Sequence, residues 1–332
     1  MSFATILTNK KILVTGGAGF IGSNLIEALL KSGNHAVCLD NFSTGKRENL
    51  SEFMNHPNFT LVEGDIRNSE DCLKACQGVD AILHQAAIGS VPRSIHNPFF
   101  SHDNNVSGFL RILDAARENG IRRVVYASSS SVYGDHPTLP KVEEQIGNQL
   151  SPYAVTKYAD ELYAGVYAKC YGMELIGLRY FNVFGKRQDP DSTYAAVIPK
   201  FVKALIQGES PVINGDGTHS RDFTFIDNVI QMNFRAAATQ NSDALNTVYN
   251  VAVGDNANLN KLIEALKENL SQFLPAVSTI PVIHGPERPG DVRHSLASVE
   301  KAQRLLGYEP SIRFEQGLKI ATDWYYQHLK QS

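Results

Sequence analysis

The sequence predicts an α/β fold, with a doubly wound parallel sheet followed by a smaller, mixed α/β C-terminal domain. Over the first half of the chain, short apolar segments alternate with segments of helical periodicity, which favours parallel strands joined by helices. A glycine-rich turn separates the first strand from the first helix, and the alternation ends after Gly185. We therefore expect one domain over residues 1–182, with a returning segment near residues 225–255, and a second domain over most of residues 183–332.

The first strand and helix are joined by a turn with a glycine at every third position. Lys11–Thr15 is a short buried strand, and Ser23–Lys31 carries its apolar residues on one helical face. Such a turn lets the backbone approach a pyrophosphate, and the helix N-terminus supplies N–H groups and a positive dipole end. A purely structural turn is the alternative. The dinucleotide-binding residues predicted here are Gly16, Gly19, Phe20, Ile21 and Gly22.

The next two strands each end near an acidic residue. His35–Leu39 ends at Asp40, whose carboxylate could hold both hydroxyls of a ribose and would repel an extra phosphate, so it favours NAD over NADP. Phe59–Val62 leads to Asp65, which we expect to accept from the adenine amino group; a turn aspartate is the alternative. The cofactor-binding residues expected at these strand ends are Asp40, Asn41, Asp65 and Ile66.

The alternation continues along the first half. The strand Ala81–His84 runs into Gln85, Ala86 and Ala87, where small side chains let the backbone lie against the cofactor. We expect helices over Val106–Glu118 and Tyr158–Tyr171, strands over Val124–Ala127 and Leu175–Leu178, and a returning strand over Tyr249–Ala252. Ligands of such sheets bind at the carboxyl ends of the strands. The residues expected to gather there are Gly16, Asp40, Ala86, Ser129 and Tyr153.

Tyr153 and Lys157 are four residues apart and therefore share one face of a helix. The positive charge of Lys157 would favour the phenolate form of Tyr153, which makes a tyrosine a proton acceptor near neutral pH. This spacing is common on surface helices, so its weight depends on what surrounds it.

With the glycine turn, a serine at a strand end and Tyr153-x-x-x-Lys157 in that order, the chain resembles the extended short-chain dehydrogenase/reductase family, which has a Rossmann-type sheet. The resemblance covers nearly the whole chain. Within the family it looks like the UDP-sugar 4-epimerases, most like the bacterial type acting on UDP-N-acetylglucosamine and its galacto epimer. The segments that carry this closer likeness are His84–Ser94, Ser129–Gly134, Leu178–Gly185 and Gly290–Leu296.

The resemblance implies a tightly held NAD that is recycled within one turnover. Tyr153 would take the proton from the 4-hydroxyl of the sugar while hydride passes to the nicotinamide, Lys157 would hold the nicotinamide ribose, and Ser129 would hydrogen-bond the reacting oxygen. The resulting 4-keto sugar would turn over and receive hydride on its other face. The cofactor contacts that complete the implied site are Gln85, Ala86, Ala87, Tyr153, Lys157 and Tyr180.

Ser130 and Ser131 stand where the 4,6-dehydratases of this family usually have an Asp-Glu pair. A hydroxyl cannot do carboxylate acid–base chemistry near pH 7. The serine run therefore argues against elimination of water.

The resemblance also implies a UDP-sugar site in the second half. Arg221 and Arg288 would clamp the diphosphate, since guanidinium groups bind phosphate oxygens in pairs, although a surface ion pair is the alternative for either. A small side chain at Ser295 would leave room for an acetamido group at carbon 2 of the sugar. The substrate-binding residues expected are Ser90, Arg93, Ser129, Ser130, Ser131, Asn182, Ala196, Val197, Val212, Asn214, Arg221, Arg288, Asp291 and Ser295.

Composition narrows the class of protein. A net charge of −3 over 332 residues gives no electrostatic reason to expect nucleic acid or a membrane as partner, and no apolar run approaches the roughly 20 residues of a bilayer span. The four cysteines lack a second Cys/His pair at metal spacing, so no metal is expected. We expect a cytoplasmic protein, and the resemblance implies a homodimer that pairs the helices near Val106–Glu118 and Tyr153–Tyr171.

Three alternatives remain open. The substrate could be UDP-glucose and UDP-galactose, or UDP-hexosaminuronic acids, for which Arg93 is a candidate cation. The reaction could be net oxidoreduction of a nucleotide sugar with exchangeable NAD. A non-catalytic binding protein is disfavoured by the intact Ser129, Tyr153 and Lys157.

Overall fold

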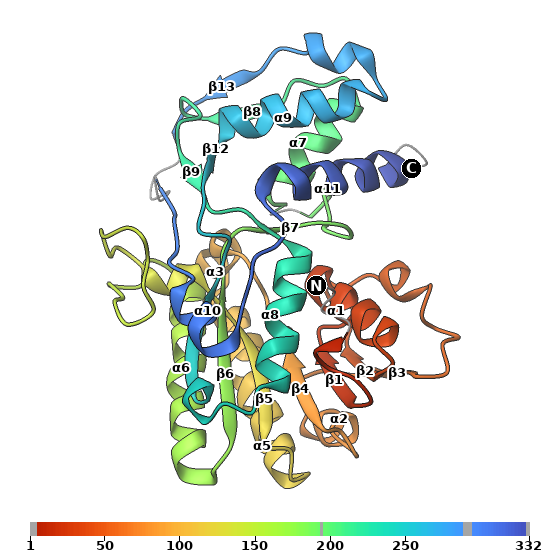
Figure 1. The fold of residues 1–332 in the computed structure, drawn as a ribbon, viewed down its shortest axis with the longest axis vertical. Coiled ribbons are helices and arrows are strands. Elements are labelled where there is room, and N and C mark those ends of the chain that lie inside the picture. Colours follow the sequence, from red (N-terminus) through yellow and green to blue (C-terminus); the bar gives the residue numbers. More distant parts are fainter. Residues whose placement is uncertain (1–4, 193–194, 288–293, 330–332) are drawn as a thin grey trace.

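A computed structural model describes residues 5–192, 195–287 and 294–329. Its centre is a seven-stranded sheet in the order β11-β6-β5-β4-β1-β2-β3, and all neighbouring strands in it are parallel (Figure 1). The predicted Rossmann-type parallel sheet is confirmed. The strands are β1 (Lys11–Thr15), β2 (His35–Asp40), β3 (Phe59–Glu63), β4 (Ala81–His84), β5 (Arg123–Ser129), β6 (Glu174–Tyr180) and β11 (Thr247–Val251).

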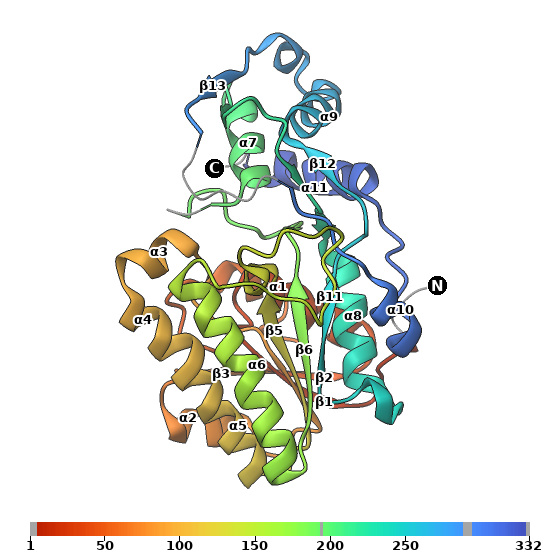
Figure 2. The ribbon, with the colours of Figure 1, turned by 90° about the vertical axis from the view of Figure 1, so that its left-hand side faces the viewer.

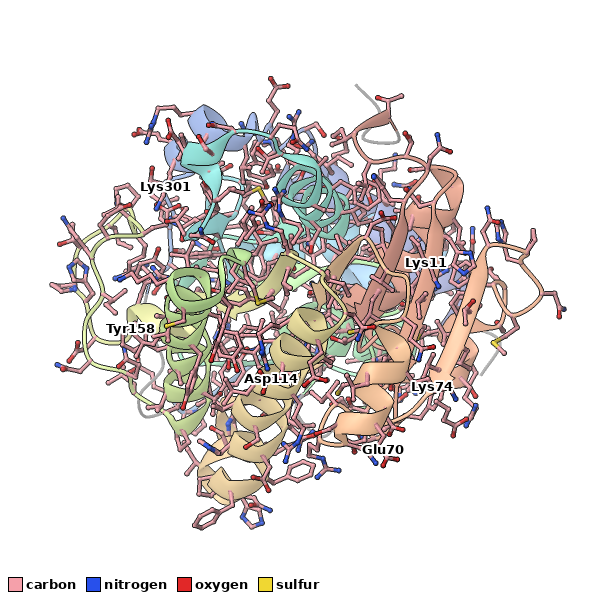
Figure 3. All side chains as sticks on the ribbon, turned by 90° about the horizontal axis from the view of Figure 1, so that it is seen from below. Lys11, Glu70, Lys74, Asp114, Tyr158 and Lys301 are labelled. Atoms are coloured by element: carbon pink, nitrogen blue, oxygen red, sulfur yellow. The ribbon has the colours of Figure 1, made fainter. Side chains whose placement is uncertain are left out.

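Helices cover both faces of the sheet. One face carries α2 (Ser69–Ala75), α5 (Gly108–Glu118) and α6 (Pro152–Tyr171), which lie side by side when the molecule is seen from below (Figure 3). In that view Glu70 and Lys74 mark α2, Asp114 marks α5 and Tyr158 marks α6. The other face carries α1 (Phe20–Lys31) and α8 (Ile226–Ala238). The strands are buried on both sides and alternate between the two cores. Leu13 packs in the core beneath α2 and α5, whereas its neighbours Ile12 and Val14 pack in the core that includes α1 and α8.

The chain reverses its direction across the sheet between β1 and β4. The strands β1, β2 and β3 follow one another outward on one side of this point, and β4, β5, β6 and β11 do so on the other. Loops at the carboxyl ends of β1 and β4 therefore diverge, and a crevice opens between them at the point where such sheets bind ligands.

The segment before α5 is longer and less regular than the sequence suggests. It holds α3 (Val91–His96), α4 (Pro98–His102) and a π-helical turn (Asp103–Ser107) that leads directly into α5. Together with α6, these elements form one side of the molecule (Figure 2).

The second half supplies a smaller region above the carboxyl ends of the sheet strands (Figure 1). It is built on three two-stranded pairs: β7 with β10, β9 with β12, and β8 with β13. The remaining elements are β7 (Val183–Phe184), α7 (Val197–Ile206), β8 (Val212–Asn214), β9 (Ser220–Arg221), β10 (Thr224–Phe225), β12 (Ala257–Asn258), α9 (Leu259–Ser271), β13 (Ile283–Gly285), α10 (Glu300–Leu306) and α11 (Phe314–Leu329), with short 3-10 helices at Arg47–Leu50, Ser130–Tyr133, Ser242–Ala244 and Pro275–Thr279.

Part of the second half returns to the sheet. β11 pairs in parallel with β6, and α8 packs against β4, β5 and β6. The segment expected to return, near residues 225–255, thus coincides with α8 and β11. No helix in the described parts of the chain is long and apolar enough to cross a membrane.

Candidate active site

A cavity of about 460 Å³ lies at the carboxyl ends of β1, β2 and β4. It extends from the glycine turn to α3 and to the chain before α7. The residues expected from the sequence that line it are Gly16, Gly19, Phe20, Ile21, Gly22, Asp40, Asn41, Ile66, Gln85, Ala86, Ala87, Arg93 and Ala196.

The glycine turn is closed tightly against itself. Gly16 has a φ of +67°, and a Cβ at Gly22 would lie 2.2 Å from the carbonyl oxygen of Gly16. A Cβ at Gly16 would also lie 2.8 Å from the backbone of Ala86. A side chain at either position is therefore excluded, and the first turn of α1 lies directly over the end of β1.

The start of α1 has unused donors that fit a pyrophosphate. The N–H groups of Phe20, Ile21 and Gly22 have no acceptor inside the helix because they belong to its first turn. Gly19 is the N-cap and offers no side chain to these donors. Since these residues line the cavity, the donors and the positive end of the helix dipole suit the phosphates of a dinucleotide.

Asp40 completes the cofactor cradle at the end of β2. Its Oδ2 accepts from the N–H of Ala18 at 2.9 Å and its Oδ1 from the N–H of Phe42 at 2.8 Å. Burial raises the pKa of Asp40, while these two backbone donors oppose the rise. Each oxygen keeps acceptor capacity toward the cavity, which suits the paired hydroxyls of a ribose. The residues present therefore fit NAD.

Asp65 lies at the edge of a second, more polar cavity of about 390 Å³. Its carboxylate pairs with Arg67 at 2.7 Å and accepts from Asn41 Nδ2 at 2.8 Å. The hydrogen bonds from Arg67 lower the pKa of Asp65 to about 2. The expected adenine contact of Asp65 would thus come from an already engaged carboxylate.

Gln85 and Tyr180 lie in one partly buried hydrogen-bonded group with Asn233. The Tyr180 hydroxyl donates to Gln85 Oε1 at 2.9 Å and accepts from Asn233 Nδ2 at 2.9 Å. Gln85 Nε2 donates in turn to Asn233 Oδ1 at 3.2 Å. The ring of contacts fixes the loop after β4 against β6 and α8, so the cavity wall at Gln85 is rigid.

Tyr153 is held at the N-terminus of α6 by two serines. Ser151 caps the helix by accepting from the N–H of Ala154, and Ser94 Oγ accepts from the N–H of Tyr153 at 3.0 Å. Ser94 belongs to α3, whose own N-cap, Ser90, accepts from the N–H of Arg93. α3 therefore fixes both Arg93 at the cavity and the backbone of Tyr153.

Lys157 lies one turn further along α6, beneath the surface. Its ammonium donates to the carbonyl oxygen of Ala127 at 2.9 Å and lies 3.4 Å from Asp160 Oδ2. The carbonyl group belongs to β5, two residues before Ser129. This contact places the lysine at the carboxyl end of the strand that carries the expected serine.

The serine run changes role from one residue to the next. Ser128 points into the core and donates to Glu161, while Ser129 Oγ accepts from the N–H and the hydroxyl of Ser131. Ser130 and Ser131 begin the 3-10 helix after β5. Ser129 is thus the serine at the strand end, as the sequence suggested, and its hydroxyl oxygen accepts a hydrogen bond from the hydroxyl of Ser131.

The residues expected to bind the nucleotide sugar are spread over the second region. Asn182 follows β6 in a left-handed conformation and donates to the carbonyl oxygen of Asp222. Val197 is the first residue of α7. The N–H of Ser295 donates to the carbonyl oxygen of Ser220, which precedes Arg221. Val212 and Asn214 are the ends of β8. None of these lines the main cavity. Arg288 and Asp291 lie outside the described residues.

Several cavity-lining residues had not been expected. The loop Ser43–Lys46 lines the cavity beside the glycine turn, where the N–H of Lys46 donates to the carbonyl oxygen of Ala18, and Asn104 reaches the cavity from the π-helical turn. Arg187 and Asp189 come from the chain after β7. A Ser-Thr-Gly-Lys run directly after the second strand was a usable signal for the loop, whereas the approach of Arg187 depends on the tertiary fold.

Comparison with known proteins agrees with this geometry. Residues 12–252 match the family described as the NAD dependent epimerase/dehydratase family. The chain is similar to the solved structure of a UDP-N-acetylglucosamine 4-epimerase from Methanobrevibacter ruminantium in complex with UDP-N-acetylmuramic acid. The two chains are 39% identical, with a TM-score of 0.90, over 98% of this chain and 100% of the other.

Two further relatives cover nearly the whole chain. A UDP-glucose 4-epimerase from Mycolicibacterium smegmatis is 35% identical over 95% of this chain and 98% of its own. The structure of a UDP-glucose 4-epimerase from Thermus thermophilus in complex with NAD is 31% identical, with a TM-score of 0.84, over 96% of this chain and 99% of that one.

Proposed function

The chain belongs to the NAD-dependent epimerase/dehydratase family as a UDP-sugar 4-epimerase, and on that premise we propose that it interconverts UDP-N-acetylglucosamine and UDP-N-acetylgalactosamine. The reaction inverts the configuration at carbon 4 of the sugar through a 4-keto form. Bound NAD would supply the hydride acceptor and donor for carbon 4.

The cofactor is held by the first half of the chain. The N–H groups at the start of α1 would bind its pyrophosphate, Asp40 would accept from its adenosine ribose, and Lys157 would donate to its nicotinamide ribose. Because Asp40 is anchored by two backbone donors, it stays in place and repels a phosphate on the ribose.

The proton is moved by Tyr153. Its phenolate takes the proton of the 4-hydroxyl and later returns it, while the buried charge of Lys157 stabilises the phenolate. Ser129 donates a hydrogen bond to the reacting oxygen, and the bonds from Ser131 leave its hydroxyl proton available because Ser129 Oγ is the acceptor in both. Ser130 and Ser131 carry no carboxylate, which argues against loss of water from the keto sugar.

The preference for N-acetylated sugars rests on Ser295. Its backbone is pinned beside Arg221 by the hydrogen bond to Ser220, so its short side chain lies near the proposed diphosphate ligand. A small residue there leaves volume for an acetamido group. The likeness to a UDP-N-acetylglucosamine 4-epimerase supports the same choice. Binding through UDP also leaves the hexose free to turn over between the two hydride transfers.

Turnover of the two substrate classes tests this choice. We expect kcat/KM to be higher for UDP-N-acetylglucosamine than for UDP-glucose. Ser295→Tyr should lower the first value more than tenfold, because added bulk in a sugar pocket is rejected sterically, and leave the second nearly unchanged. Equal or faster turnover of UDP-glucose by the unaltered protein would refute the proposed preference.

Tyr153→Phe tests the proton transfer. The variant should lose about 10²–10⁴-fold in kcat, the range supplied by general acid–base catalysis, and still carry NAD. If the unaltered protein instead released NADH and an oxidised sugar, in place of epimerisation, the nucleotide-sugar oxidoreductase would be supported.

A homodimer is proposed through α6. Val155, Leu162 and Val166 follow one stripe of the helix and are each more than half exposed, and Phe99 on the adjacent α4 is 84% exposed. An apolar patch of this kind on a soluble enzyme marks an interaction surface. A second copy presenting the same face would bury it in a four-helix arrangement.

A further inference from the structure

Lys157 is part of a buried ion pair whose second member has no place in the mechanism above. The side chains of Lys157 and Asp160 are only 2% and 1% exposed, and Lys157 Nζ lies 3.4 Å from Asp160 Oδ2. The two residues are three apart on α6, so Asp160 lies about one turn further along the helix than Lys157. Its direct contact toward the site is with Lys157.

The other oxygen of Asp160 is unsatisfied. Oδ1 is buried and has no hydrogen-bond partner among the residues that the structure describes. An ionised carboxylate usually accepts several hydrogen bonds when buried, and leaving an oxygen without any is costly. A proton on Asp160 removes the charge and so lowers this cost, whereas ionisation keeps the ion pair. The protonated and the ionised forms of Asp160 are thus each favoured by one of these two contributions to the free energy.

The nearest charged groups on α6 and β6 already neutralise one another. Glu161 pairs with Arg179 at 2.8 Å and also accepts from Ser128 at 2.6 Å, and all of these contacts are buried or nearly so. The negative charge of Glu161 still disfavours ionisation of Asp160, but it is matched locally by Arg179. Within the described residues, Asp160 is the carboxylate that pairs with Lys157.

The groups that face the pair from β4 and β5 are neutral. Burial, together with the charge of Lys157, lowers the pKa of His84 to about 3. Burial, together with Glu161 and Asp160, raises the pKa of Tyr126 well above its ordinary value. Neither group changes charge near neutral pH. The electrostatic field at Lys157 in this range therefore depends on the protonation of Asp160.

We propose that Asp160 is a positioning residue that sets the proton affinity of Tyr153 through Lys157. When Asp160 is ionised, it offsets the charge of Lys157, and the phenolate is less stabilised. When Asp160 is protonated, the full charge of the lysine acts on the phenol. The proposal rests on the proposed role of Tyr153 as the base.

The titration range of Asp160 fits this role. Burial raises its pKa to about 7, against the charge and the hydrogen bond of Lys157, which lower it. The carboxyl group thus changes charge near neutral pH. As pH rises, Asp160 ionises and opposes formation of the phenolate, so the activity rises less steeply with pH than it would for a single group.

Asp160→Asn in the NAD-loaded protein tests the proposal, since the amide keeps the shape of the side chain and removes its charge. The acid limb of the kcat/KM profile should move to lower pH by about one unit, the lower end of what a nearby charge produces. KM for the nucleotide sugar at the optimum should not change. The matched control, Asp243→Asn, alters an exposed aspartate away from the site and should leave the profile in place.

A second readout does not depend on turnover. The near-ultraviolet absorbance of the phenolate, taken as the difference from Tyr153→Phe in the same background, should appear at lower pH in Asp160→Asn. Asp160→Ser, smaller and also uncharged, should shift it in the same direction and serves if the asparagine variant does not fold. A purely structural role would change stability or NAD content without moving either midpoint.

The proposal would be overturned if a folded, NAD-loaded Asp160 variant had the same midpoints as the unaltered protein, both in the kcat/KM profile and in the phenolate absorbance. This outcome is distinct from failure of the proposed base. In that case Tyr153→Phe itself would stay active and the difference absorbance would be missing from every background.

Discussion

Asp160 also links the charge of the site to the stability of the folded chain. Its ordinary pKa is 3.8, and in the folded protein burial raises it to about 7. Between these values the folded state holds a proton that the unfolded state has released. The stability contributed by this group is therefore complete below pH 3.8 and is lost as the pH rises through about 7.

We expect the free energy of unfolding of the unaltered protein to fall more steeply over this pH range than that of Asp160→Asn. Denaturant unfolding at a series of pH values measures both slopes. Asp222 and Glu143 also have pKa values raised by burial, but both variants contain them, so the difference isolates Asp160. Parallel slopes would show that Asp160 does not hold a proton in the folded state.

Individual residues differed in how far the sequence revealed them. Tyr153 and Lys157 were candidates from the sequence because their spacing, the glycine turn and a strand-end serine occur in one order. Asp160 carried no such signal, since a charged residue three positions after a lysine is usual on a solvated helix face. Its burial depends on how α6 packs over β5 and β6, which only the tertiary structure defines.

At the scale of the element, the turn between β1 and α1 is the most constrained part of the cofactor site. A methyl group at Gly22 would lie 2.2 Å from the carbonyl oxygen of Gly16, which is backbone and cannot move aside alone. We expect Gly22→Ala to destabilise the protein by about 1–3 kcal/mol, the usual cost of overpacking. It should also lose bound NAD, because the first turn of α1 would move. Thermal unfolding and the NAD content of the purified protein measure the two effects.

Gly165 provides the matched control for this substitution. It lies in α6, and a Cβ there would meet nothing within 4 Å. Gly165→Ala should therefore stabilise by about 0.5–1 kcal/mol, since alanine is the better helix former, and keep its NAD. A Gly22→Ala protein with normal NAD content and stability would contradict the close approach seen in the turn.

Elements with strong periodicity could be predicted closely, whereas short ones could not. The strands Lys11–Thr15 and Ala81–His84 have the predicted bounds. The two-residue strands β9 and β12 were missed because two residues have no periodicity. The π-helical turn before α5 was also missed, since an extra residue in a helix turn leaves little trace in the apolar pattern.

At the scale of the whole molecule, the sequence predicted the kind of sheet but not the order of its strands. Alternating segments indicate parallel neighbours, yet nothing local in Thr247–Val251 states that it pairs with β6. The same limit applies to the substrate residues. Asn182 and Ser295 reach the neighbours of Arg221 through packing of the second region, which motifs in the chain do not encode.

The exposed stripe on α6 leads to a prediction about assembly. Leu162 and Val166 are 56% and 52% exposed, so in the single chain neither has a buried role that glutamate would disrupt. If α6 pairs with its copy, Leu162→Glu and Val166→Glu place like charges across a desolvated interface, which should convert the dimer to a monomer while NAD content and fold persist. Sedimentation equilibrium measures the mass, and Ile320→Glu, at a similarly exposed residue of α11, should remain dimeric.

An unaltered protein that sediments as a monomer would exclude this interface. Dimeric Leu162→Glu and Val166→Glu proteins would place the contact on another face, and the stripe, extended by Phe99 on α4, would then need a different partner.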